Sequence, residues 1–200
     1  MIAIIDYDAG NIRSVEKAFN FIGEQTAVTG DPDVILSADR VVLPGVGAFG
    51  DAMGRLERSG LADAIREVAK KGTPFLGICL GLQLLFEESE ESPGVCGLGI
   101  LKGKIIKIPE NAGLKVPHIG WNSVSLNGGR LFRDTREGEY FYFVHSFYLK
   151  ADDERIVKAK TSYGADIHAS VESGNVFATQ FHPEKSGEAG LKVLKNFASV

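Results

Sequence analysis

The stretch TPFLGICLGLQLLFEE, residues 73–88, predicts a buried strand that turns sharply into a helix. The part before Cys79 is apolar and strand-like, whereas the part after it has helical spacing. Gly77 and Gly81 flank Cys79, two residues away on either side. This is the cysteine form of the Gly-x-Ser-x-Gly elbow, in which small neighbours make room for an exposed nucleophile at a strained turn. The alternative interpretation of Cys79 is a small buried core residue.

The same alternation of strand and helix patterns extends over the first half of the chain. It predicts a parallel sheet that is covered by helices on both faces. The strand near residue 40 is expected to stop at Pro44-Gly45. The strand-like runs are residues 1–6, 25–29 and 40–43, and the helical spacing recurs over residues 12–22 and 61–71.

The second half is richer in strand-like runs and closes with a helix that carries Leu191, Leu194 and Phe197 on one face. We therefore expect one α/β domain, residues 1–200, whose sheet has an added antiparallel portion. The candidate strands of this half are residues 103–108, 123–126, 140–144, 156–161, 169–172 and 176–180.

The composition is globular, with 44% hydrophobic and 24% charged residues among 200. A net charge of -4 argues against a general nucleic-acid binder, which normally carries a basic patch. The first apolar run has no basic leader and is far too short to span a bilayer. We expect a cytoplasmic protein without membrane contact, in which Cys79 and Cys96 form no structural disulfide.

A thiol nucleophile needs a base, and the base needs a group that orients it. His182 is the best candidate of the four histidines, because it lies in the run Gln180-Phe181-His182-Pro183-Glu184 after a strand-like segment. Pro183 favours an extended conformation at His182, so His182 and Glu184 are expected to share a face. The alternative is a structural histidine beside a surface glutamate.

The other histidines give weaker signals. A structural role is the better interpretation of His118 and His168, whereas His145 is equally compatible with packing at a strand end and with lining a site. Because the histidines and cysteines are scattered, we expect no metal site and no bound cofactor.

Attack on an amide carbonyl creates an oxyanion, which requires N–H donors. One donor is expected from the backbone of Leu80, directly after the nucleophile. The second is expected from residues 44–50, PGVGAFG, whose glycines would let the backbone approach a ligand. A plain turn after a strand is the alternative, and the segment lacks the Lys-Ser/Thr ending of a P-loop.

Taken together, these segments resemble the triad class of glutamine amidotransferases, and more narrowly the glutaminase subunits of imidazole glycerol phosphate synthases. The similarity runs nearly end to end. Two departures are Asp8, where the family usually has Gly, and Phe147, where it often has Tyr; Asp tolerates the positive φ of such a loop. The resemblance is carried by Gly10-Asn11, Arg13-Ser14-Val15, PGVGAFGDAM at 44–53, GICLGLQLLFEE at 77–88, PHIGWN at 117–122, FVHS at 143–146 and TQFHPEKS at 179–186.

The resemblance implies a flavodoxin-like, mixed but mostly parallel sheet flanked by helices. Cys79, His182 and Glu184 match the catalytic triad of the family, in which the cysteine forms an acyl-enzyme thioester. Val46 matches the oxyanion-strand residue whose N–H must turn toward the site. The positions that would hold glutamine are Gly47, Gln83 and Glu91, with His145 and Ser146 as further candidates, and those that would face a partner are Asn11, Trp121, Tyr142 and Lys185.

The resemblance also implies a heterodimer with a cyclase subunit, a (β/α)8 barrel, that receives ammonia made from glutamine. That ammonia would serve imidazole glycerol phosphate formation in histidine biosynthesis, and the isolated subunit would be nearly inactive. A size argument points the same way. Only one helix follows the His-Pro-Glu segment, so no part of the chain remains to bind a nitrogen acceptor.

Three alternatives remain open on the residues alone. The same chemistry could serve another synthase, such as anthranilate or aminodeoxychorismate synthase. A binding or chaperone-like protein of this fold could keep a reactive cysteine, although it would lack the His-x-Glu pair. A peptidase or γ-glutamyl hydrolase would turn over its substrate without a partner.

Overall fold

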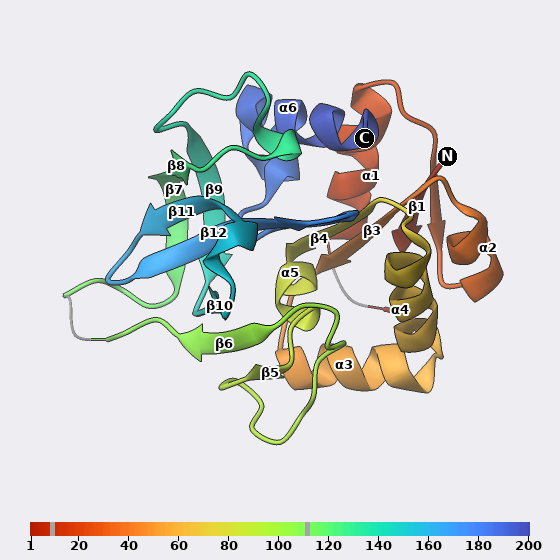
Figure 1. Ribbon diagram of the computed structural model, residues 1–200, viewed down its shortest axis with the longest axis horizontal. Coiled ribbons are helices and arrows are strands. Elements are labelled where there is room, and N and C mark those ends of the chain that lie inside the picture. The colour runs from red at the N-terminus through yellow and green to blue at the C-terminus, as the bar shows by residue number, and fades with distance from the viewer. Residues whose placement is uncertain (9–10, 111–112) are drawn as a thin grey trace.

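The computed structural model describes residues 1–8, 11–110 and 113–200 and is built on a long mixed sheet (Figure 1). Its first half is parallel, in the order β2-β1-β3-β4. These strands are β1 (Ile2–Ile5), β2 (Thr26–Thr29), β3 (Arg40–Gly45) and β4 (Phe75–Cys79). The helices between them are α1 (Ile12–Phe21), α2 (Pro32–Ser37), α3 (Phe49–Arg58) and α4 (Leu61–Lys71).

The second half continues the sheet beyond β4 in the order β13-β12-β10-β6-β5, with β11 and β8 attached through β12. In this half, β13 pairs with β4 and β5 pairs with β6 in parallel, whereas the pairings that β12, β10 and β11 make with one another and with β13, β6 and β8 are antiparallel. The bounds are β5 (Glu88–Ser89), β6 (Gly103–Lys107), β8 (Ser125–Leu126), β10 (Phe147–Ala151), β11 (Val157–Ser162), β12 (Asp166–Ser173) and β13 (Val176–Thr179). The predicted α/β class with an antiparallel portion is confirmed.

A separate antiparallel pair, β7 (His118–Ser123) and β9 (Tyr140–His145), stands beside the main sheet. Three short 3-10 helices and two helices complete the structure. They are η1 (Arg130–Phe132), η2 (Glu154–Ile156), η3 (Pro183–Lys185), α5 (Leu80–Leu84) and the C-terminal α6 (Gly187–Ala198).

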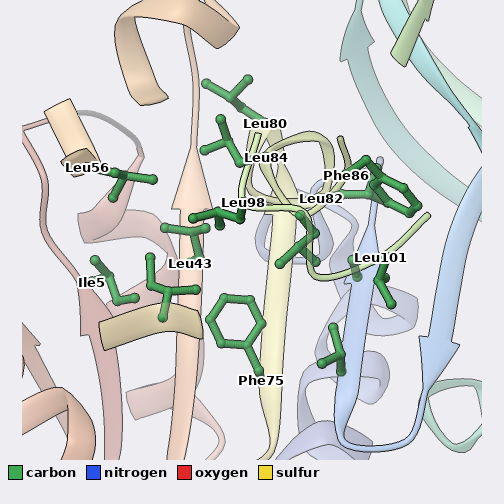
Figure 2. Close-up of a cluster of buried hydrophobic side chains, with 14 of the residues drawn as sticks. Ile5, Leu43, Leu56, Phe75, Leu80, Leu82, Leu84, Phe86, Leu98 and Leu101 are labelled. Atoms are coloured by element: carbon green, nitrogen blue, oxygen red, sulfur yellow. The ribbon is translucent and has the colours of Figure 1, made fainter. Parts of the chain in front are cut away.

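Two apolar layers sandwich the parallel strands. Helices α2, α3, α4 and α5 pack on one face, where Ile5, Leu43 and Phe75 point from three adjacent strands into a cluster with the leucines of α5 (Figure 2). Helices α1 and α6 cover the other face, and Phe19 and Phe197 meet there edge to face. Burial on both faces explains why these strands are continuously apolar rather than alternating.

The elements around the elbow differ from expectation in two ways. Helix α5 ends at Leu84 instead of continuing to Glu88, because the segment after Cys96 donates hydrogen bonds to the carbonyls of Leu84 and Leu85. Strand β3 continues through Pro44 and Gly45 instead of stopping there. Its pairing with β1 ends at Val42, so the missing N–H of Pro44 removes no ladder bond on that side.

Several elements were not predicted from the sequence. They are α2, β7, β10 and α3, which begins inside the glycine-rich segment 44–50 that was expected to supply an oxyanion donor. Gly10, part of one similar segment, lies outside the described residues, whereas Asp8 has the expected positive φ of 60°.

Candidate active site

The predicted site residues converge where the parallel strands end. Strands β3, β4 and β13 run in one direction, so their carboxyl ends meet at the same edge, the usual place for a site in such a sheet. Gly45 is paired with Cys79, and Thr179 with Ile78. This register brings the segments that follow Gly45 and Thr179 to either side of the elbow.

The elbow has the strained geometry that its sequence predicts. Cys79 adopts φ 57° and ψ −108°, a conformation that L-residues rarely hold, between β4 and α5. A methyl group at Gly81 would lie 1.9 Å from the carbonyl oxygen of Leu43. One at Gly77 would lie 2.6 Å from the carbonyl oxygen of Gly81. Both glycines are therefore required by the close passage of the backbone.

His182 and Glu184 form the predicted pair, with His182 Nδ1 2.8 Å from Glu184 Oε1 and both side chains almost fully buried. The backbone reaches this arrangement by a different route from the one expected. His182 is extended, with φ −96° and ψ 97°, but Pro183 then starts η3. The carboxylate therefore meets the ring through a 3-10 turn, and the expectation of one extended run was wrong.

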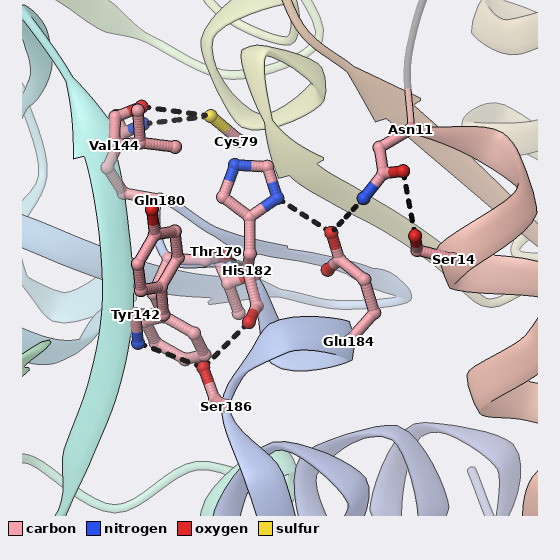
Figure 3. Close-up of polar contacts among 11 residues, drawn as sticks. Asn11, Ser14, Cys79, Tyr142, Val144, Thr179, Gln180, His182, Glu184 and Ser186 are labelled. Carbon is pink, nitrogen blue, oxygen red and sulfur yellow. Dashed lines mark hydrogen bonds and ion pairs between the residues drawn. The ribbon is translucent and has the colours of Figure 1, made fainter. Parts of the chain in front are cut away.

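The three side chains lie in sequence in space, with the imidazole between the sulfur and the carboxylate (Figure 3). Among the described residues, Nε2 of His182 has no hydrogen-bond partner. Figure 3 shows this nitrogen on the side of the ring that faces Cys79. A third contact holds the carboxylate from behind, since Asn11 Nδ2 donates to Glu184 Oε1 at 3.4 Å and Asn11 Oδ1 accepts from Ser14 Oγ at 2.8 Å.

The surroundings of His182 favour its protonated form. Burial opposes charge on the ring, but the nearby Cys79 sulfur and the Glu184 carboxylate outweigh it and raise the pKa of His182 to about 10. An imidazolium beside a sulfur is the arrangement that supports a thiolate nucleophile. The surroundings thus favour a protonated imidazole beside the Cys79 sulfur.

A cavity of about 440 Å³ opens beside the elbow. It holds all of the predicted oxyanion and substrate positions, and a small amino acid fits this volume. Gln83 donates to the Phe147 carbonyl at 3.0 Å, and Glu91 accepts from the N–H of Phe49 at 2.8 Å, at the start of α3. The predicted residues that line it are Val46, Gly47, Cys79, Leu80, Gln83, Glu91, His145, Ser146, His182 and Lys185.

The sequence left open whether His145 packs at a strand end or lines a site, and the structure shows that it does both. It ends β9 and it lines the cavity. Both ring nitrogens are engaged within the protein, because Nδ1 lies 2.9 Å from the Phe147 carbonyl and Nε2 lies 3.1 Å from His118 Nδ1. Burial lowers the pKa of His145 to about 3, so the ring is neutral. His118 is structural as expected, stacked on Phe143 and Tyr163.

Comparison with known proteins identifies the family. The model of the family described as glutamine amidotransferase class-I matches residues 3–200. The chain belongs to this family. It is 53% identical to the imidazole glycerol phosphate synthase subunit HisH of Methanothermobacter thermautotrophicus, over 100% of this chain and 98% of that one. It is also 53% identical to the subunit HisH of Moorella thermoacetica, over 100% and 94% of the two chains.

Solved structures support the fold of the family. The structure of PurLQS from Thermotoga maritima superposes with a TM-score of 0.76 over 99% of this chain and 97% of that chain. The two are 24% identical in sequence, so this likeness concerns the fold alone. The class-I amidotransferase architecture therefore places the elbow, the His-x-Glu segment and the glycine-rich strand end of this chain around one cavity.

In this amidotransferase, the residues expected to face a partner do not form one group, because Lys185 lines the cavity whereas Trp121 and Tyr142 are not among its lining residues. Trp121 of β7 and Tyr142 of β9 are paired in register and meet edge to face, with ring centroids 6.2 Å apart. Lys185 Nζ lies 5.8 Å from the centre of the Tyr142 ring. Asn11 instead contacts Glu184. We name the outward side of Ile119, Trp121, Tyr140 and Tyr142 the β7–β9 face; Trp121 and Tyr140 on it are each 55% exposed.

The sequence did not single out three groups near the cysteine: two side chains and one backbone carbonyl. Gln180 Nε2 lies 3.7 Å from the Cys79 sulfur, and the Val144 carbonyl lies 3.9 Å from it. The hydroxyl of Tyr7 is buried close to Gly45, and burial, with Cys79 nearby, raises the pKa of Tyr7 above its usual range. No local signal could have found Gln180, because the pairing of Thr179 with Ile78 is what brings it to the sulfur.

Two negative findings concern the described parts of the chain. In residues 1–8, 11–110 and 113–200, no group of three or more His, Cys, Asp or Glu side chains is arranged to hold a metal ion. No helix within these same segments has the length and apolar character needed to cross a membrane.

Proposed function

We propose that this chain is the glutaminase subunit of an imidazole glycerol phosphate synthase, a single-domain enzyme that hydrolyses glutamine and supplies the ammonia to a cyclase subunit. The observation that carries the proposal is the line Cys79–His182–Glu184 at the edge of an open cavity. Identity of 53% to HisH subunits over the whole chain supports the choice of synthase.

In the first half-reaction, the Cys79 thiolate attacks the carboxamide carbon of glutamine, so that a C–S bond forms and the C=O electron pair moves onto oxygen. The N–H of Leu80 and one from the Val46–Gly47 segment would stabilise this oxyanion. His182 then gives its Nε2 proton to the amide nitrogen. The C–N bond breaks, ammonia leaves, and a thioester remains on Cys79.

In the second half-reaction, neutral His182 removes a proton from water, which attacks the thioester carbon. Collapse of that intermediate breaks the C–S bond, releases glutamate and returns the electron pair to sulfur. Glu184 stays ionised throughout and holds the ring in the tautomer that presents Nε2 to the sulfur. The cycle ends with the same thiolate–imidazolium pair.

The partner is proposed to cover the β7–β9 face. An exposed cluster of large apolar side chains such as Ile119, Trp121 and Tyr140 is typical of an interaction surface. The cavity mouth carries Lys185, which also lies over Tyr142, so a partner on this face would reach the site. We propose the cyclase subunit, a (β/α)8 barrel, as that partner in a heterodimer.

Control by the partner has a structural basis at Val46 and Gly47. Gly47 has φ 103°, and no heavy atom lies within 4 Å of where its Cβ would be. Because Gly47 has no Cβ, its backbone can adopt conformations that other residues rarely hold, and a rotation of the Val46–Gly47 peptide that presents an N–H to the oxyanion is compatible with this freedom. This supports regulation of hydrolysis by occupancy of the partner.

The decisive experiment compares glutaminase activity of the chain alone, with the cyclase subunit, and with the cyclase subunit plus its nucleotide ligand. Activity should rise by at least about 100-fold in the last mixture, because an N–H donor to the oxyanion is gained. Full activity of the isolated chain would instead favour a γ-glutamyl hydrolase.

Cys79→Ala should abolish glutamine-dependent synthesis by the complex and leave ammonia-dependent synthesis intact. Glutamine turnover should fall by at least about 1,000-fold, since no other group here replaces the nucleophile. Loss of both activities in a complex that still assembles would contradict an ammonia-transfer role.

A further inference from the structure

Two groups of the described residues lie within hydrogen-bonding distance of the Cys79 sulfur, and they suit opposite protonation states. The Val144 carbonyl, at 3.9 Å, can only accept a hydrogen bond and therefore suits a thiol S–H. The amide nitrogen of Gln180, at 3.7 Å, can donate and therefore suits a thiolate. Once the sulfur is ionised, Gln180 is the neighbour that stabilises it.

The orientation of the Gln180 amide follows from its neighbours rather than from a choice between oxygen and nitrogen. The Phe147 carbonyl can only accept, so the amide nitrogen of Gln83 must face it, at 3.0 Å. The second N–H of Gln83 points to Gln180 Oε1 at 3.1 Å. The nitrogen of Gln180 is therefore left facing the sulfur. If the Gln180 amide were flipped, its nitrogen would face the Gln83 nitrogen and its oxygen would face the Cys79 thiolate, so both contacts would be unfavourable.

The Phe147 carbonyl, the first acceptor in this series of hydrogen bonds, is itself held in place. It also accepts from His145 Nδ1 at 2.9 Å, which makes His145 Nε2 the acceptor for His118 Nδ1 at 3.1 Å. Gln83, Gln180, His118 and His145 are each at most 6% exposed. Burial limits competition from water for these bonds, even though Gln83 and His145 also line the cavity, and buried networks of this kind hold their members rigidly.

We propose that Gln180 is a further catalytic residue, whose amide N–H holds the Cys79 thiolate in place for attack, and that Gln83 and the Phe147 carbonyl position that amide. The inference rests on the proposed glutaminase function. No proton leaves Gln180 in this role. It acts before attack and again when the C–S bond of the thioester intermediate breaks, the two stages at which sulfur carries the negative charge.

The direct test measures the reactivity of the sulfur without substrate or partner. In a Cys96→Ala background Cys79 is the only thiol, since the chain has two cysteines. Alkylation by iodoacetamide is followed against pH for wild type, Gln180→Glu and Gln180→Met. Both variants should react about tenfold more slowly near neutral pH, with the pH midpoint moved upward, because a donor to a charged acceptor is lost.

Gln25→Glu provides the matched control, because it makes the same chemical change at an exposed site and should alkylate at the wild-type rate. Gln180→Glu preserves the shape of the side chain, so the test does not depend on how the Met variant folds. Unfolding in urea identifies any variant that lost its structure. A folded Gln180→Glu variant with wild-type alkylation would overturn the proposal.

Turnover in the complex with the cyclase subunit gives a second readout. Gln180 contacts the sulfur and is absent from the residues that line the cavity, so kcat should fall about tenfold while KM changes little. A rise in KM at constant kcat would count against the role. If wild type shows no partner-stimulated glutaminase, the proposed function fails, whereas the alkylation result still decides the role of Gln180.

Discussion

His182, which precedes η3, and His145, which ends β9, line the same cavity, but their surroundings favour a protonated ring at His182 and a neutral ring at His145. Both are buried, at 1% and 6% exposure, so burial does not distinguish them. The partner at Nδ1 does, since it is the Glu184 carboxylate for His182 and the Phe147 carbonyl for His145. The pKa values are about 10 and about 3. A carboxylate and a neighbouring sulfur overcome the cost of burial, and a neutral carbonyl does not.

The two rings also differ at Nε2. That of His145 is occupied by His118, whereas that of His182 has no partner among the described residues and faces the sulfur. Of the two rings, only that of His182 is both protonated and unbonded at Nε2, so only His182 can transfer a proton into the cavity. The difference separates a proton-transfer group from a structural one within a single cavity.

The substitution expected to reduce the difference between the two histidines most is Glu184→Gln, which gives His182 Nδ1 a neutral partner like that of His145. Partner-stimulated kcat/KM should fall by about 1,000-fold or more, as when the orienting carboxylate of a triad is neutralised. The pKa of His182 should fall as well, because one of the groups that raise it is lost. Steady-state kinetics and NMR titration of the ring measure the two effects.

Glu188→Gln is the matched control, since Glu188 is an exposed residue of α6 four positions further on. It should keep wild-type kinetics. If Glu184→Gln retained the full rate, Glu184 would not be the orienter.

Cys79→Ser tests the second reason why the pKa of His182 lies above that of His145, which is the nearby sulfur. A serine hydroxyl does not ionise in this range, so His182 loses the negative neighbour that does most to raise its pKa, and burial then acts against Glu184 alone. Proton affinity of the ring should fall by about 100-fold, measured by NMR titration of the isolated chain. Titration of His145 should not change. An unaltered His182 pKa would show that the sulfur carries no charge in the resting enzyme.

Features set by local sterics were predictable from the sequence. The glycine spacing around Cys79 follows from the close passage of the backbone at Gly77 and Gly81, so the pattern itself specifies the turn. The nearness of His182 and Glu184 was also predictable, because only Pro183 lies between them in the chain, which limits their separation whether the backbone is extended or turns into η3.

Features that depend on strand register were not predictable. Gln180 reaches the sulfur because Thr179 is paired with Ile78, and His118 reaches His145 because the two are directly opposite in the β7–β9 pair. Neither register follows from the residues near these positions. The early end of α5 has the same origin, since a segment more than ten residues further on supplies hydrogen bonds to its last turn.

The smallest predicted effect concerns the pH dependence of stability that arises from His118, the neutral hydrogen-bond partner of His145. Burial lowers the pKa of His118 to about 4, below the ordinary value of about 6.5 in the unfolded chain. The unfolded chain therefore binds the proton first, and stability is lost as pH falls from about 6.5 toward 4. His118→Phe keeps a flat ring between Phe143 and Tyr163 and removes this titration. Between about pH 8 and about pH 5 the variant should lose about 1 kcal/mol less unfolding free energy than wild type, after allowance for solvent screening.

Urea unfolding at the two pH values measures this difference directly. Changes in carboxylate charge occur in both proteins and cancel in the comparison, and His145 continues to oppose protonation in both. An equal loss of stability in wild type and variant would show that His118 is protonated at mild acidity. The added proton would lie on His118 Nε2, opposite the Asn122 amide nitrogen, whereas the hydrogen bond from His118 Nδ1–H to His145 Nε2 would remain.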